Sequence, residues 1–199
     1  MGLREAKKLH TRQAIADEAM RLFVTRGFDA VTVAEVAEAA GVSEKTVFNY
    51  FPTKEDLFFD EVPARQAALA DAIRSRGKGS IFAALREQQT AQCARLTSPE
   101  FVHFARVIEG SAALKAKELE VMSGFADTLT EVIRDELRVP EIDAHVAANA
   151  LVGVHWQFFR NARAQALAGV HGPAAARKLR AQLNRAYDLL EQGLASLER

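Results

Sequence analysis

Cysteine and proline are scarce in this 199-residue sequence, and its net charge is zero. The single cysteine, Cys93, excludes an intrachain disulfide framework and any metal site built from several thiolates. Only five prolines occur in a chain that is 49% hydrophobic and 26% charged, so the composition predicts a folded, soluble protein. No stretch is apolar enough to span a membrane, and the charged first residues do not form a secretory signal. Together these absences predict a cytoplasmic protein with no membrane partner.

The distribution of charge tells more than the total. A balance of 26 basic and 26 acidic residues gives no reason by itself to expect a polyanionic partner. Within residues 1–12, however, Arg4, Lys7, Lys8 and Arg12 face a single acid. This basic arm suits contact with phosphate groups, and it equally suits the solvated first turns of a helix. Both interpretations stay open.

Helix-start and helix-stop signals recur along the whole chain, whereas no segment alternates as a strand would. Thr32 with Glu35 forms a T-x-x-E capping box, and Gly27 and Gly41 stand where two helices end. The expected helices are 10–26, Thr32 to Gly41, 44–51 and a connecting helix over 54–76, then longer helices up to 197 after a loop at 74–80. The sequence therefore predicts an all-α fold.

Two domains are expected within that fold. Residues 1–53 are predicted to form a three-helix unit with a helix-turn-helix, because the helix after Ser43 is short and follows a glycine turn. Val47 would pack inward, which leaves a polar outer face suited to the DNA major groove. The alternative is a small helical subdomain whose surface is merely polar. Residues 54–199 are predicted to form a helical bundle.

A family resemblance sharpens this expectation. The stretch "TVAEVAEAAGVSEKTVFNYFPTKEDLF", preceded by "AIADEAMRLFVTRGFDAVTV", resembles the DNA-binding domain of the TetR family of one-component bacterial transcriptional regulators. The resemblance covers about residues 10 to 60. It implies a ligand-responsive regulator, most often a repressor, that binds a palindromic double-stranded DNA operator as a homodimer. It also implies that residues 54–199 form the domain for effector binding and dimerisation.

The resemblance also implies roles for individual residues. Thr32 would cap its helix against a phosphate, Tyr50 and Lys54 would hold the DNA backbone, and the start of the third helix would face the groove. The full set implied to bind DNA is Thr32, Ser43, Glu44, Lys45, Thr46, Phe48, Asn49, Tyr50 and Lys54. One position departs from the family, because Phe48 stands where many members have a tyrosine that donates to a phosphate. Phe48 would instead pack inward or touch a thymine methyl group.

The last two expected helices, 142–167 and 174–197, carry small residues and leucines at roughly heptad spacing. This pattern suits a four-helix interface with a second copy of the chain, and it also suits closure of the chain's own core. The residues assigned to a homodimer interface are Val146, Ala150, Leu151, Val154, Phe158, Leu179, Leu183, Leu190 and Leu194.

The bundle region is rich in aromatic residues interleaved with polar ones, which is typical of a small-molecule pocket and of a packed core. The residues assigned to an effector pocket are Phe82, Gln89, Phe101, Phe104, Ile108, Met122, Phe125, Trp156 and Phe159. The stretch "FARVIEGSAALKAKELEVMSGFADTLTEVI" resembles a TetR subgroup in which some members respond to fatty acyl-coenzyme A esters. It implies an apolar or acyl-type effector.

Two rival classes remain. Glu100 and His103 form an E-x-x-H pair, half of what a helical di-metal carboxylate enzyme needs, but the sequence holds no second pair. Phosphate-loop, nucleophile-elbow and dinucleotide motifs are also missing, so no metal, cofactor or catalytic residue is expected. The second rival class is a helical interaction protein that has lost DNA binding. It would apply if Lys45, Tyr50 and Lys54 proved unimportant for DNA binding.

Overall fold

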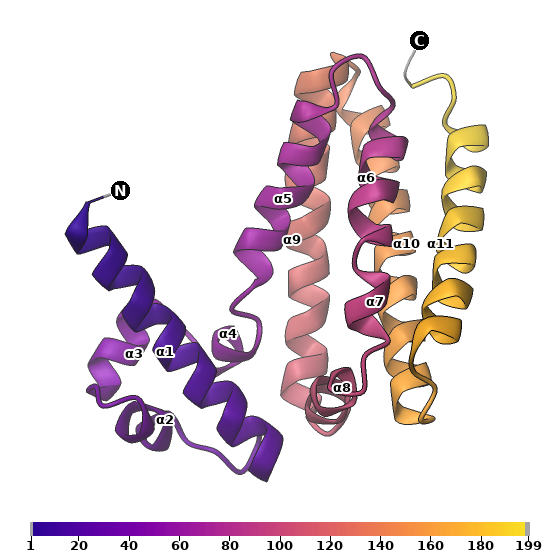
Figure 1. Ribbon diagram of the computed structural model, residues 1–199. Coiled ribbons are helices and arrows are strands. Elements are labelled where there is room, and N and C mark those ends of the chain that lie inside the picture. Colours follow the sequence, from indigo (N-terminus) through magenta and orange to yellow (C-terminus); the bar gives the residue numbers. More distant parts are fainter. Residues whose placement is uncertain (1, 198–199) are drawn as a thin grey trace. The chain divides into compact units, whose positions relative to one another are not determined.

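The computed structural model describes residues 2–197, except for the side chains of residues 3 and 4, and this part of the chain is all-helical (Figure 1). The predicted all-α fold is confirmed. In chain order the helices are α1 (Leu3–Arg26), α2 (Val33–Ala39), α3 (Glu44–Tyr50), α4 (Lys54–Phe58), α5 (Val62–Ser75), α6 (Ile81–Thr90), α7 (Cys93–Leu96), α8 (Phe101–Glu109), α9 (Ala112–Leu137), α10 (Glu141–Leu167) and α11 (Pro173–Gly193). Within residues 2–197, no helix is long and apolar enough to cross a membrane.

The chain divides into two compact units. The first unit runs to Val62 and also contains the segment Arg106–Lys117, whereas the second contains Pro63–Ala105 and the chain from Glu118 onward. The first unit therefore extends beyond the expected boundary at residue 53 and includes a segment distant in sequence. Local signals mark where helices begin and end, but they do not show which distant segment packs on which helix.

Apolar residues at helical spacing build the first unit. Helix α1 packs on α2 and α4, and α2 packs on α3. Ile15, Ala19 and Phe23 lie on one face of α1 and are buried, together with Val36 of α2 and Val47 of α3. Because these positions recur every three or four residues, a single stripe of α1 serves as the base for the short helices.

The connecting helix expected over 54–76 is instead two helices, α4 and α5, separated at residues 59–61. Pro63 is the second residue of α5, and proline fits the first turn of a helix but not its interior, because it lacks an N–H group. Arg12 of α1 donates to the carbonyl oxygen of Asp60 at 2.8 Å and lies 4.7 Å from the ring centre of Phe51. Arg12 of the basic arm therefore holds the chain at this break.

The second unit is a bundle in which α10 and α11 run side by side (Figure 1) and α11 also packs on α6 and α7. Its interior is mostly apolar, yet an ion pair joins α9 and α10 there. Arg163 donates to both carboxylate oxygens of Glu118, and the two side chains are only 6% and 12% exposed. The pair ties α10 to α9 inside the bundle.

A histidine also lies in the bundle interior. The His155 ring packs against Phe125 of α9 and Phe159 of α10, with centroid distances of 5.3 and 4.7 Å. Its Nδ1 atom is buried without a hydrogen-bond partner. Burial, and to a smaller extent the guanidinium of Arg65, lowers the pKa of the imidazole to about 4. The folded protein therefore holds His155 neutral at pH values where an unfolded chain would protonate it.

This difference predicts a loss of stability in mild acid. Between pH 6.5 and pH 4 His155 becomes protonated in the unfolded chain but stays neutral in the folded chain. The free energy of unfolding therefore falls as the pH falls through that window. We expect the parent to lose about 3 kcal/mol more than His155→Leu between pH 7 and pH 4. Urea unfolding at both pH values measures this loss. His145→Leu, an exposed position on the same helix, should keep the pH dependence of the parent.

Candidate nucleic-acid interface

Helix α3 is fixed at its start and along its inner face. The Ser43 side chain caps it by accepting a hydrogen bond from the Thr46 backbone N–H at 3.2 Å, and the two hydroxyl oxygens lie 2.9 Å apart. Val47 is buried, and so is Phe51, which follows the last residue of the helix. With the inner side anchored by these groups, the opposite side of α3 faces outward at a fixed angle.

The outer side of α3 carries most of the residues predicted to bind DNA. Glu44, Lys45, Phe48 and Asn49 are exposed, whereas Thr46 and Tyr50 are half-buried. Phe48 is 47% exposed, so its ring does not pack inside the unit, and the inward role considered for it does not apply. The structure thus brings charged, amide and phenyl groups together on one short helix.

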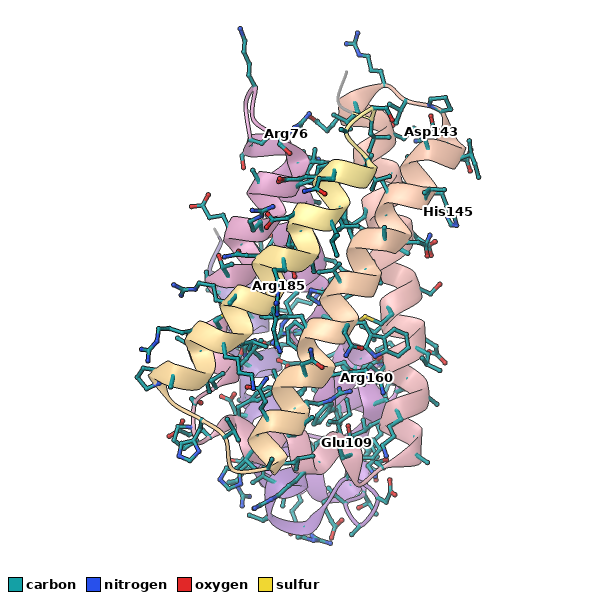
Figure 2. The ribbon with its side chains drawn as sticks, turned by 90° about the vertical axis from the view of Figure 1, so that its right-hand side faces the viewer. Arg76, Glu109, Asp143, His145, Arg160 and Arg185 are labelled. Carbon is teal, nitrogen blue, oxygen red and sulfur yellow. The ribbon has the colours of Figure 1, made fainter. Side chains whose placement is uncertain are left out.

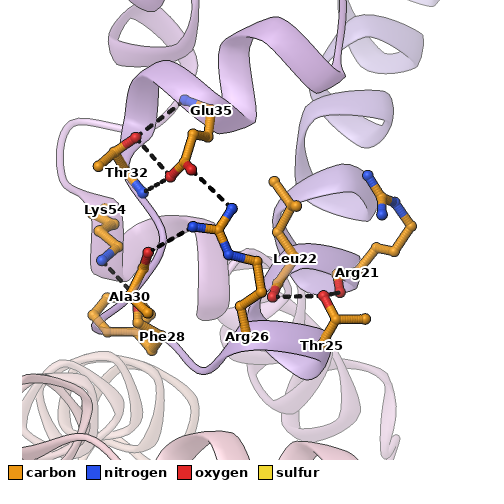
Figure 3. Close-up of polar contacts among 9 residues, drawn as sticks. All are labelled: Arg21, Leu22, Thr25, Arg26, Phe28, Ala30, Thr32, Glu35 and Lys54. Carbon is orange, nitrogen blue, oxygen red and sulfur yellow. Dashed lines mark hydrogen bonds and ion pairs between the residues drawn. The ribbon is translucent and has the colours of Figure 1, made fainter.

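Thr32 lies in a hydrogen-bonded network at the start of α2 (Figure 3). Glu35 Oε2 accepts from the Thr32 backbone N–H at 2.7 Å and from its hydroxyl at 2.9 Å. Arg26 Nη1 lies 2.8 Å from Glu35 Oε1, and Arg26 Nη2 donates to the Ala30 carbonyl at 3.0 Å. The Thr32 hydrogen bonds and the Arg26 guanidinium lower the pKa of Glu35 to about 2. Sequence reasoning found the capping box but missed Arg26, because no local pattern links the end of α1 to α2.

Lys54 is placed differently from the expectation that it holds the DNA backbone. Its Nζ atom donates to the carbonyl oxygen of Phe28 at 2.7 Å and lies 4.2 Å from the centre of the Phe28 ring (Figure 3). Partial burial lowers the pKa of the ammonium. The charge of Lys54 therefore fixes the turn between α1 and α2, an internal role that the sequence did not reveal.

This geometry predicts a stability effect for Lys54. Removing a charged hydrogen-bond donor leaves the Phe28 carbonyl without that partner, so Lys54→Ala should lower the free energy of unfolding by about 2 kcal/mol. Lys45→Ala, which truncates an exposed side chain, should stay within about 0.5 kcal/mol of the parent. Chemical unfolding of both variants tests the contrast, and equal stability of the two would contradict the internal role.

The segment Arg106–Lys117 contributes two polar contacts to the first unit. Ser111 Oγ donates to Asp29 Oδ1 at 2.7 Å, and Lys117 Nζ lies 3.3 Å from Asp56 Oδ1. Asp29 and Asp56 stand in the turn after α1 and in α4, respectively. These contacts hold the middle and the last residue of the segment on the same unit that carries α3. No motif in the sequence pointed to them.

The residues assigned to a dimer interface fall into two groups. Leu151, Phe158, Leu179 and Leu183 are buried within the single chain, so they form its own core and offer no surface to a partner. The leucine stripe of α11 is the inner face of that helix, which is the alternative that the heptad spacing left open. The remaining residues are exposed at Val146 and half-buried at Ala150, Val154, Leu190 and Leu194.

The residues assigned to an effector pocket are mostly interior. Phe82, Gln89, Phe101 and Phe125 are buried in the second unit. Phe104, Met122, Trp156 and Phe159 are half-buried in the same unit. Ile108 is buried too, but it belongs to the first unit and so does not group with the others. Two interior polar atoms, Gln89 Oε1 and Trp156 Nε1, have no hydrogen-bond partner.

A surface groove of about 480 Å³ lies between α6 and α11, and its lining includes none of the assigned pocket residues. It is lined by Ala83, Arg86, Glu87, Thr90, Ala91, Arg180, Asn184 and Glu191. Arg86 lies 2.9 Å from Asp188 Oδ1 and 3.1 Å from Glu191 Oε2, so carboxylates already neutralise its charge. The groove therefore has no strong preference for an anion.

The E-x-x-H pair does not form a metal site in the part of the chain that the structure describes. Glu100 precedes α8, and both Glu100 and His103 are exposed. Among residues 2–197, no three His, Cys, Asp or Glu side chains gather in a way that could hold a metal ion.

Comparison with known proteins gives a consistent result for the first unit. Residues 15–60 match the family described as bacterial regulatory proteins, tetR family. The chain is 35% identical over 78 residues to the HTH-type transcriptional regulator TcmR of Streptomyces glaucescens, which covers 39% of this chain and 34% of that protein. It is 30% identical over 81 residues to the HTH-type transcriptional repressor AcnR of Corynebacterium glutamicum, covering 41% and 43%. The chain thus spans less than half the length of these curated relatives.

The fold is shared over a greater length. The crystal structure of FadR from Thermus thermophilus, a TetR-family transcriptional repressor in complex with lauroyl-CoA, superimposes with a TM-score of 0.52. That likeness covers 92% of this chain and 94% of FadR at 23% identity, so it concerns the fold alone. Residues 15–60 thus match the tetR family of bacterial regulatory proteins, and the helical fold of the chain is shared with a solved structure of a TetR-family repressor.

Proposed function

We propose that the chain is a ligand-responsive transcriptional regulator, a repressor, that binds operator DNA through α3 and is not an enzyme. The observation that carries this proposal is the outer side of α3, where Lys45, Phe48 and Asn49 are exposed beside a buried Val47. A helix presented in this way fits the width of the major groove. The curated relatives TcmR and AcnR, which carry regulator and repressor names, support the same class.

The chemistry of the exposed groups gives each a role in recognition. Lys45 is the side chain suited to the two acceptors on the major-groove edge of guanine, and Asn49 to the donor and acceptor of adenine. Ser43 and Tyr50 carry hydroxyl groups suited to phosphate oxygens, which position a protein without reading sequence. Lys54 acts mainly through Phe28, so its contribution to DNA affinity comes through the placement of the turn.

Selection of DNA from a random pool by the purified full chain tests the proposal, since a recovered consensus settles the function class. On that consensus, Lys45→Ala should cost about 1 to 3 kcal/mol, and the loss should be confined to particular base pairs. Binding titrations to the consensus and to random DNA measure the difference. If Lys45→Ala weakened both equally, Lys45 would be a phosphate contact and not a reader.

The proposal includes a homodimer that matches a palindromic operator. Figure 2 looks onto α10, which carries Asp143, His145 and Arg160, and onto α11, which carries Arg185. Ile142, Val146 and Leu189 are 66%, 51% and 71% exposed, and the core does not require their burial. Gly153 lies midway along α10, and no atom lies near the place where a side chain would be. Another helix could therefore approach closely there. Val146 stays in the proposed contact surface, and Ile142, Gly153 and Leu189 replace the buried leucines there.

The effector is proposed to be a small apolar or acyl-type molecule held in the second unit. Buried phenyl rings with a few unpaired polar atoms, Gln89 Oε1 and Trp156 Nε1, are the kind of lining such a ligand needs. The FadR structure with lauroyl-CoA supports the acyl class for a protein of this fold. A ligand that binds more tightly to a bundle form with low operator affinity would release the DNA.

Lauroyl-CoA serves as the probe for this part of the proposal. It should raise the unfolding temperature of the parent and release the selected operator, because a ligand stabilises only the folded form that it binds. Phe125→Ala should reduce both effects more than it reduces ligand-free operator binding. Large destabilisation of Phe125→Ala with no response of the parent to lauroyl-CoA would make these aromatic residues ordinary core.

A further inference from the structure

Phe48 is an exposed apolar side chain on the reading helix. It is 47% exposed, while its neighbour Val47 is 1% exposed, so the Phe48 ring lies outside the core that buries Val47. Residues three and four positions apart share a helix face, which places Phe48 beside Glu44 and Lys45 on the outer side. All three are exposed. The phenyl ring therefore lies among the groups that would enter the groove, and it is not part of the core.

The chemistry of a phenyl ring limits what it can contact there. It has no hydrogen-bond donor or acceptor, so it cannot pair with a phosphate or with the polar edge of a base. The major groove presents one apolar group, the 5-methyl of thymine. A tyrosine at this position could donate a hydrogen bond to a phosphate or touch the methyl group, whereas a phenylalanine can make only the apolar contact.

We infer that Phe48 is a specificity-determining residue that reads one thymine in each half-site through its 5-methyl group. This inference rests on the proposed DNA-binding function and adds a base identity to it. It places thymine within reach of the base pair that Lys45 reads, because the two side chains are one helical turn apart on the same face of α3.

The test replaces thymine by deoxyuridine, which lacks only the methyl group. Each thymine of the selected consensus is substituted in turn, and binding to the parent protein is measured. Burial of one methyl group predicts that a single position per half-site weakens binding about fourfold, with the other thymines unaffected. No loss at any thymine, with tight binding to the consensus retained, would overturn the inference and leave the DNA-binding function standing.

Variants at position 48 test whether the phenyl ring is the group that contacts the thymine methyl. Phe48→Ala should bind the thymine and deoxyuridine operators equally, and Phe48→Leu, which stays apolar, should keep most of the discrimination. Val24→Ala is the matched control, because it shortens another exposed apolar side chain of the first unit away from α3. If Phe48→Ala kept the full fourfold difference, the methyl group would be read by another residue. Failure to select any DNA would instead count against the proposed function itself.

Discussion

Replacing Glu118 by alanine should lower the free energy of unfolding by about 3–5 kcal/mol, because it leaves the Arg163 guanidinium buried without its carboxylate. Arg163 is 5% exposed and donates to both oxygens of Glu118, so solvent cannot take the place of the lost partner. Glu118 is the first residue of α9 in the second unit, and the effect should therefore appear in the unfolding of the bundle. Urea unfolding followed by circular dichroism measures it.

Two controls sharpen this experiment. The exposed pair of Arg134 and Asp135, at 3.0 Å, is worth less than about 1 kcal/mol, so Asp135→Ala should unfold almost as the parent does. The double variant Arg163→Met with Glu118→Leu removes both charges and should recover much of the loss. A small effect for Glu118→Ala alone would mean that the Arg163 guanidinium finds another carboxylate or reaches water.

The second large effect concerns α11. Leu183→Glu should abolish the fold of the bundle, because the side chain is 2% exposed and the substitution buries an unpaired carboxylate as well as removing a core leucine. We expect a loss of more than about 4 kcal/mol, visible as a chain that is unfolded or aggregated at room temperature. If Leu183 lay in the dimer interface to which the sequence pattern assigned it, the same substitution would give a folded monomer, and the burial of Leu183 is the reason for expecting an unfolded chain instead.

Leu189→Glu is the matched variant for the dimer proposal. The position lies on the same helix but is 71% exposed, so the substitution should leave the unfolding of the monomer nearly unchanged. If the outer side of α10 and α11 joins two copies, sedimentation should show a folded monomer with weak operator binding. If Leu189→Glu sedimented as a dimer like the parent, the interface would have to lie elsewhere on the chain. If the parent itself were monomeric at micromolar concentration, the dimer proposal would be wrong.

Residues whose signals are local could be predicted from the sequence. Thr32 with Glu35 and Ser43 mark the starts of α2 and α3 through caps that span three residues, and the structure contains both caps. Capping residues act on the backbone next to them, so their effect needs no knowledge of the rest of the fold. The all-helical architecture follows from the same kind of signal, repeated along the chain.

Contacts between distant residues could not be predicted in this way. Lys54 meets a carbonyl 26 positions earlier, and Arg163 meets a carboxylate 45 positions earlier. A leucine stripe such as Leu179 and Leu183 indicates an apolar helix face, but it does not say whether the covering surface belongs to the same chain or to a second copy. The break between α4 and α5 has a local signal in Pro63, but apolar residues at helical spacing continue on both sides of it and indicate a single helix.

The participation of Arg106–Lys117 in the first unit has a consequence for how the protein is made. Ribosomes add about 5–20 residues per second, and domains at the N-terminus generally fold first during synthesis. Here the contact of Asp29 with Ser111 and the contact of Asp56 with Lys117 form only after residues 111 and 117 have been synthesised, long after α3 has emerged from the ribosome. The nascent helix-turn-helix therefore spends several seconds without its final contacts. A translational pause placed between codons 62 and 106 would lengthen its exposure to proteases and chaperones.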